Sequence, residues 1–166
     1  MTSQLASVLW LLNSARFLLR CSALTINSME TKSIPRGIRN NNPLNLRISD
    51  NAWLGKCRPN TDGQFEQFIT MVYGIRAAFR NMRTIIRRNP NCTLKRLIEI
   101  WAPASENNTN AYIKAVCART RLRENFILDF RDRTHMVYIL AAMAFVENGQ
   151  PLNLQQIEEA YDLAKA

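Results

Sequence analysis

Residues 36–47 read Arg-Gly-Ile-Arg-Asn-Asn-Asn-Pro-Leu-Asn-Leu-Arg. This stretch holds four asparagines, one glycine and one proline, a composition that disfavours both a helix and a central strand. Asparagine tolerates left-handed backbone and hydrogen-bonds to neighbouring amides, so we predict an ordered loop here. Two interpretations of the asparagines remain open. They either cap the structure that follows or recognise a neutral polar ligand such as a sugar, because side-chain amides offer both donors and acceptors.

The composition around this loop is that of one basic globular domain. The chain has 166 residues, is 47% hydrophobic and carries a formal net charge of +9, with arginine far outnumbering lysine. This length suits one domain with a proper core. The charge implies an acidic partner, such as nucleic acid, an anionic envelope surface or another negatively charged polymer. It does not choose among them.

The cysteines and the single histidine form no metal-binding pattern. Cys21, Cys57, Cys92 and Cys117 are scattered without a Cys-X-X-Cys pair, and His135 lies at no recognisable ligand spacing from them. We therefore expect free thiols that are mostly buried, and neither a metal site nor a cofactor.

The first 29 residues are read as an N-terminal extension, and residues 30–166 as the domain. The apolar run at residues 5–12 is too short to cross a membrane. A signal peptide would require a basic residue before this run, and the sequence has none there. Its leucines suit a short amphipathic helix. Alternatively, native translation starts at Met29. Peptides from residues 2–21 in a mass spectrum of the native protein would contradict that start.

Apolar residues at helical spacing predict five helices after the loop. The expected helices span residues 71–88, 94–101, 110–118, 135–147 and 154–164. Thr93 and Thr134 stand immediately before two of them and are expected to cap their N-termini. The only plausible strands are short, at residues 44–48 and 65–69. The sequence therefore predicts a mainly α-helical single domain with a small β element, of the α+β class.

Arginines form a basic ridge along the helix expected at residues 71–88. They recur at spacings of four, three and four residues, at Arg76, Arg80, Arg83 and Arg87. No acidic residue occurs between Glu66 and Glu99, so the ridge has no carboxylate partners on its own helix. The arginines either cover the edge of the core with their stems or face a polyanion.

Three glutamates are candidates for acid–base chemistry. Glu147 ends an apolar stripe just before Asn148-Gly149, a pair typical of a helix C-terminus. Partial burial and the helix dipole would favour the protonated form that a general acid needs there. The alternative is that Glu147 turns to solvent or pairs with an arginine. Glu106 precedes a helix, where the dipole favours the ionised form, and Glu66 lies between two phenylalanines.

Residues 36–43 resemble the opening motif of a family of phage and prophage virion-associated structural proteins, commonly written RGIRNNNPGNI. The likeness continues in order and at similar spacing to the end of the chain. The further blocks are Trp53-Leu54-Gly55, Phe65-Glu66-Gln67-Phe68, Gly74-Ile75-Arg76-Ala77, Trp101-Ala102-Pro103, Glu106-Asn107-Asn108-Thr109 with Tyr112, and Glu147-Asn148-Gly149. That family is often regarded as lysozyme-like.

Residues 41–46, the tryptophan block and residues 65–68 are also similar to the NNLFGIK, tryptophan and FxxF pattern of bacterial cell-wall glucosaminidases. The two resemblances imply a lysozyme-like fold that binds and cleaves the glycan strands of peptidoglycan, in the phage particle or the bacterial envelope. Glu147 would be the general acid, Glu106 the second carboxylate and Glu66 a third choice. Sugar groups would be bound by Asn40, Asn41, Asn42 and Asn45, with Tyr73 or Trp101 stacking on the rings.

Three departures from these families keep other functions open. Leu44 stands where the phage family has glycine. Cell-wall glucosaminidases and lytic transglycosylases carry their acid before the loop, where this domain has only Glu30. With Glu147 as the general acid, the acid would instead come after the loop in the chain. A non-catalytic virion or wall-binding protein is therefore the alternative. A nucleic-acid binder is favoured only by charge, because the sequence has no interleaved aromatic–basic platform or recognition helix.

Overall fold

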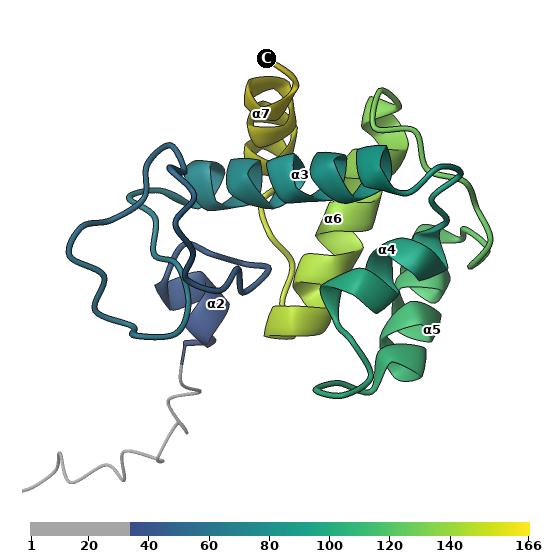
Figure 1. The fold of residues 1–166 in the computed structure, drawn as a ribbon, viewed down its shortest axis with the longest axis horizontal. Helices are drawn as coiled ribbons and strands as arrows, with labels where there is room; N and C mark the ends of the chain where they lie inside the picture. Colours follow the sequence, from purple (N-terminus) through teal and green to yellow (C-terminus); the bar gives the residue numbers. More distant parts are fainter. Residues whose placement is uncertain (1–33) are drawn as a thin grey trace, which may run out of the picture. The chain divides into compact units, whose positions relative to one another are not determined.

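The structure is a computed structural model that describes residues 34–166. The expected extension, residues 1–29, lies outside the described residues. The described residues form six helices and no strand (Figure 1). The helices are α2 (Arg36–Arg39), α3 (Met71–Arg88), α4 (Leu94–Trp101), α5 (Thr109–Thr120), α6 (Arg133–Asn148) and α7 (Leu154–Lys165). The predicted mainly helical fold is therefore confirmed.

The hydrophobic core is built between α3, α6 and α7, with α4 and α5 packed beside them (Figure 1). Phe79 of α3, Tyr161 of α7 and Phe130 form an aromatic cluster, in which the Phe79 and Tyr161 ring centroids are 5.3 Å apart. The Tyr161 hydroxyl donates to the Phe130 carbonyl at 2.6 Å, so its burial leaves no unpaired donor. None of the helices within residues 34–166 is long and apolar enough to cross a membrane.

Polar side chains cap α3, α4, α5, α6 and α7 at their N-termini. Thr93 caps α4 as predicted, its hydroxyl accepting from the Arg96 amide. The prediction that Thr134 caps α6 is wrong, because the helix begins one residue before it. Asp132 takes that place and accepts from the His135 amide at 3.1 Å. A carboxylate is a favourable cap because it also opposes the positive end of the helix dipole.

The arginine ridge of α3 binds the C-terminal end of α7. Arg76 donates to the Leu163 carbonyl at 3.2 Å, and Arg80 donates to the Ala164 carbonyl at 3.1 Å. Arg83 reaches the same Ala164 carbonyl at 3.5 Å. These cations satisfy the last carbonyls of a helix at the negative end of its dipole. Three of the four ridge arginines thus join two helices that are far apart in the sequence.

The start of the asparagine loop differs from the prediction, because residues 36–39 form the single helical turn α2. Pro35 precedes the turn with a φ of −51°, close to a helical value, and its carbonyl accepts from the Ile38 and Arg39 amides. Asn41 and Asn45 then adopt left-handed backbone, with φ of 50° and 49°. Left-handed backbone at asparagines was predicted from the sequence, and these two residues confirm it.

The two predicted strands are replaced by isolated bridges, one of which joins Arg47 to Phe65. The Asn42 side chain explains why no ladder extends from it. Its amide nitrogen donates to the Leu46 and Glu66 carbonyls, each at 2.9 Å, and its oxygen accepts from the Leu46 amide. A buried side chain therefore bonds backbone groups that a neighbouring strand would otherwise pair.

Gly74 allows the loop to lie directly on α3. A Cβ atom at this position would collide with the Asn41 carbonyl, which is backbone and cannot turn away as a side chain would. The Asn41 side chain donates to the Phe68 carbonyl at 2.9 Å, which fixes the loop in place. Close backbone approach is a common reason for glycine within a helix.

We predict that Gly74→Ala lowers the free energy of unfolding by about 1–3 kcal/mol, because the loop must move away from the added methyl group. In an unobstructed helix the same change would instead stabilise by about 1 kcal/mol. Urea unfolding followed by circular dichroism measures the difference. A variant as stable as the parent would contradict the close contact between the loop and α3.

Candidate functional site

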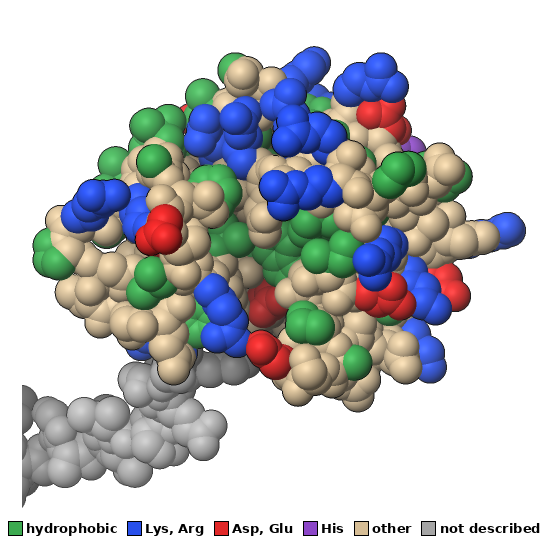
Figure 2. Space-filling model, viewed as in Figure 1, with side chains coloured by type: hydrophobic (Ala, Val, Ile, Leu, Met, Phe, Trp, Pro, Cys, Tyr) green, Lys and Arg blue, Asp and Glu red, His purple; other side chains and the backbone are tan. Residues whose placement is uncertain are grey.

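A groove of about 480 Å³ lies between the asparagine loop, α3 and the connection from α4 to α5. Figure 2 shows this hollow in the middle of the visible face, with hydrophobic side chains inside it and acidic side chains beside it. The loop contributes Asn45 and Arg47, and the α4–α5 side contributes Trp101 and Glu106. The remaining lining residues are Leu44, Leu46, Asn81, Thr84, Ile85, Arg88, Asn89, Ile100 and Pro103.

Glu147 is half-buried near the end of α6 and is held by two neutral donors. The Asn45 amide donates to Glu147 Oε2 at 2.9 Å, and the Tyr112 hydroxyl donates to Oε1 at 3.1 Å. Burial, reinforced by the nearby charge of Glu147, raises the pKa of Tyr112 far above its ordinary value. Tyr112 therefore keeps its proton. Within residues 34–166, no basic side chain forms an ion pair with Glu147.

Glu106 is held by a cation instead. Arg47 donates to Glu106 Oε2 at 2.6 Å, and the two side chains are 66% and 54% exposed. So exposed an ion pair adds little stability, but it places a carboxylate on the groove. Asn45 and Arg47 are two residues apart in the loop, and each holds one of the two leading candidate carboxylates. The structure thus joins Glu106 and Glu147 to the same short stretch of chain.

The other three asparagines of the loop bond within the domain. Asn40 and Asn42 are buried, at 2% and 1% exposure. The Asn40 amide donates to Asp62 at 2.8 Å and accepts from Gln67 at 3.2 Å, while Asn41 and Asn42 bond to backbone carbonyls as described above. The capping interpretation therefore describes these three. Asn45 is the loop asparagine that lines the groove.

Glu66, Tyr73 and Glu147 are not among the residues that line the groove, and Glu147 is joined to the lining through its hydrogen bond from Asn45. Glu66 is fully buried, and its Oε1 accepts from Lys56 at 2.9 Å and from the Ser49 amide at 3.0 Å. Tyr73 packs over Gly55, where an added Cβ would collide with the ring. Glu66 therefore ties together the loops before α3, and Tyr73 explains the glycine of the Trp53-Leu54-Gly55 block.

Two further residues contribute to the site without having been assigned a role from the sequence. Tyr112 supplies a hydrogen bond to Glu147, and Asn148 joins the loop to α6 by donating to the Pro43 carbonyl at 2.7 Å. Gly37 makes room for Asn148, because a Cβ there would lie 2.5 Å from its Oδ1. Tyr112, Asn148 and Gly37 all belong to the blocks that resemble the phage family. This resemblance is the one sequence feature that could have indicated a role for them.

Residues 34–166 contain no cluster of His, Cys, Asp and Glu that could hold a metal ion. Cys57, Cys92 and Cys117 are free, as expected, and burial raises the pKa of the Cys92 and Cys117 thiols.

Comparison with known proteins shows similarity to a phage protein along most of the chain. The chain is 34% identical over 152 residues to protein P5 of Pseudoalteromonas phage PM2, and the match covers 88% of this chain and 93% of P5. The chain belongs to the family of PM2 protein P5. The phage relationship suggested by the asparagine motif is therefore confirmed. No protein-family model matches this P5-family chain.

Asp62 anchors the start of the loop in this P5-family domain. Arg36 donates to its two oxygens at 2.7 and 2.9 Å, and Asn40 and the Phe65 amide donate as well. The Asp62 side chain is only 2% exposed. The hydrogen bonds from Arg36, followed by that from Asn40, hold the pKa of Asp62 well below its ordinary value.

We predict that the domain loses stability as the pH falls below about 4, the ordinary pKa of aspartate, because the unfolded chain then takes up a proton that folded Asp62 resists. Asp62→Asn should be less stable at pH 7 and should lose less stability between pH 5 and pH 2.5. Urea unfolding across this range measures both effects. Asp50→Asn, at an exposed loop position, is the matched control. Parallel pH profiles for the parent and Asp62→Asn would contradict the prediction.

Proposed function

We propose that this P5-family chain is a lysozyme-like protein that binds a peptidoglycan glycan strand in the groove and cleaves it. One observation carries the proposal: Asn45 and Arg47 line the same groove, and each binds one of the two candidate carboxylates, Glu147 and Glu106. Paired carboxylates beside a groove are what glycoside cleavage requires. The phage origin of protein P5 is compatible with an activity on the bacterial wall.

In the proposed reaction, the Glu147 carboxylate first takes up a proton, in place of one of the hydrogen bonds that it accepts from Asn45 and Tyr112. It then gives this proton to the glycosidic oxygen as the bond to the anomeric carbon breaks. The Glu106 carboxylate stabilises the positive charge that develops on the sugar ring, or orients the attacking water. Asn45 lines the groove and positions Glu147 through its side-chain amide, while its Oδ1 is buried without a partner. Trp101, half-buried in the groove wall, offers a face for ring stacking. Asn40, Asn41 and Asn42 act indirectly, by holding the loop in place.

We predict that Glu147→Gln slows the clearing of a purified peptidoglycan suspension by about 10²- to 10⁴-fold, the usual contribution of a general acid. Glu106→Gln should also slow it, and sedimentation with peptidoglycan should show that both variants still bind. Glu159→Gln, on an exposed face of α7, is the matched control and should clear at the parental rate. Full activity of both Glu147→Gln and Glu106→Gln would show that the assignments are wrong.

A second candidate is a non-catalytic virion component that binds the wall. It is favoured by the bonding of the carboxylates, because both oxygens of Glu147 already accept hydrogen bonds and Glu106 is paired with Arg47. In this alternative, Glu147 serves to fasten the loop to α6. Co-sedimentation with intact peptidoglycan and no release of soluble muropeptides from it would support the binder over the enzyme.

A further inference from the structure

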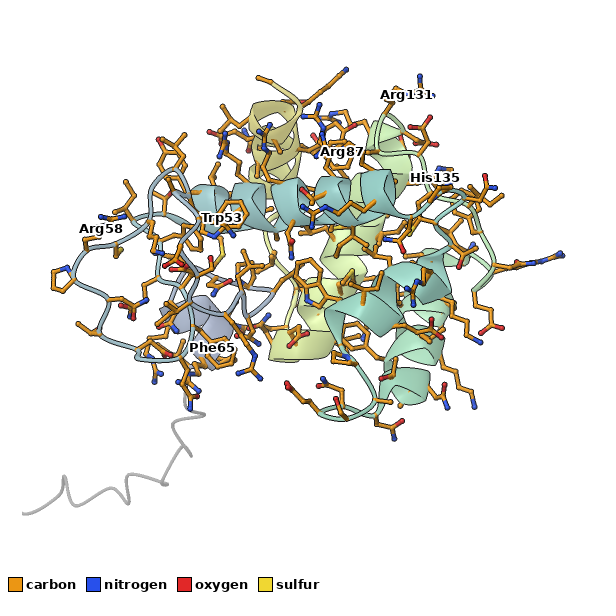
Figure 3. The ribbon with its side chains drawn as sticks, viewed as in Figure 1. Trp53, Arg58, Phe65, Arg87, Arg131 and His135 are labelled. Atoms are coloured by element: carbon orange, nitrogen blue, oxygen red, sulfur yellow. The ribbon has the colours of Figure 1, made fainter. Side chains whose placement is uncertain are left out.

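A second hollow, of about 630 Å³, borders the C-terminal end of α3. The groove takes Thr84, Ile85 and Arg88 from this helix, whereas the second hollow takes Arg83, Ile86 and Arg87. The segment at residues 127–131 forms its opposite side, and Lys165 of α7 also lines it. Figure 3 labels Arg87 and Arg131, one from each of these two sides. We call this the basic hollow.

The floor of the basic hollow is apolar. Leu128 and Phe130 are 5% and 9% exposed and belong to the hydrophobic core, and the half-buried Ile86 packs against the same core. Ile127 stands at the edge with 58% of its surface exposed. A hollow of this volume lies within the range of small-molecule sites, which are mostly apolar with a few polar groups that fix orientation.

The edge of the basic hollow is cationic. Its single carboxylate, Asp129, is already neutralised by Arg131, which donates to it at 2.9 and 3.1 Å and lowers the pKa of Asp129. Within residues 34–166, Arg83, Arg87 and Lys165 form no ion pair. Figure 2 shows basic side chains gathered along the upper part of the visible face, over α3.

Arg83 is held beside the apolar floor. Its Nη1 lies 3.5 Å from the Ala164 carbonyl oxygen and 3.4 Å from the Lys165 carbonyl oxygen, both long hydrogen bonds, and its guanidinium lies 5.7 Å from the centroid of the Phe130 ring. Both hydrogen bonds use the same nitrogen, Nη1, so the other guanidinium donors remain for a ligand.

We propose that the basic hollow binds a lipid-like phosphate, with its headgroup on Arg83, Arg87 and Lys165 and its apolar chain against Ile86, Leu128 and Phe130. Guanidinium groups suit phosphate because they donate to two of its oxygens at once. The apolar floor adds a term proportional to the area buried, which a purely ionic ligand does not gain. A neutral glycan would leave the cations unpaired. This proposal does not depend on the function proposed for the groove.

The full chain is titrated with octyl phosphate, below its micelle concentration, by isothermal titration calorimetry. Inorganic phosphate and octyl glucoside are the two matched probes. Inorganic phosphate has the anionic group without the apolar chain, and octyl glucoside has the apolar chain without the anionic group. We expect octyl phosphate to bind at least about tenfold more tightly than either, since it gains both the charged hydrogen bonds and the apolar contact. Equal binding of inorganic phosphate or of octyl glucoside would overturn the proposal, as would no binding of octyl phosphate.

Two pairs of variants locate the site. Arg87→Gln should weaken octyl phosphate binding about tenfold, whereas Arg88→Gln, the next residue of α3 but directed to the groove, should leave it unchanged. Ile127→Ser should weaken binding, whereas Leu54→Ser, equally apolar and 52% exposed outside the hollow, should not. Circular dichroism checks that each variant is folded. Equal losses in Arg87→Gln and Arg88→Gln would show a diffuse charge effect and overturn the proposal.

Discussion

The contact between the asparagine loop and the helices is the constraint on which the site depends. Gly74 brings the Asn41 backbone onto α3, and Asn148 fastens Pro43 to the end of α6. Because both anchors bind backbone, they fix the path of the chain rather than one side chain. Asn45 then meets Glu147 at a distance set by the fold, although 102 residues separate them. The groove wall is therefore tied to the helices against which it packs.

Buried amides do most of this positioning. Asn42 bonds three backbone groups at once, and Asn40 links the loop to Asp62, which in turn holds Arg36. The bonds from Asn42 satisfy the Leu46 amide and the Glu66 carbonyl, which would otherwise be buried unpaired at a cost of about 1–3 kcal/mol each. A loop with few apolar side chains thus keeps one conformation through hydrogen bonds. Asn40, Asn41 and Asn42 therefore have structural roles, whereas Asn45 lines the groove and donates to Glu147.

The helices could be predicted from the sequence, but much of the site could not. Apolar spacing located α3 and α4. Glu147 was singled out from local chemistry, and Asn45 was one of four candidate asparagines. The sequence could not show that Glu147 meets Asn45 and Tyr112, because these contacts are long-range and depend on how the elements pack. Glu66 was misleading for a related reason. Its flanking phenylalanines indicate burial, but only the structure shows that Lys56 pairs with it away from the groove.

The bonds from α3 to the end of α7 have a consequence for synthesis on the ribosome. Arg76 and Leu163 are 87 residues apart, and the apolar face of α3 packs against α7 as well. During synthesis, the apolar face of α3 stays uncovered by α7 until nearly the whole domain has emerged. Contacts so distant along the chain slow folding. The many arginines beside the apolar stripe keep α3 hydrated before α7 is made. Their positive charges also make the α3 helices of different chains repel one another, so newly made chains are less prone to associate.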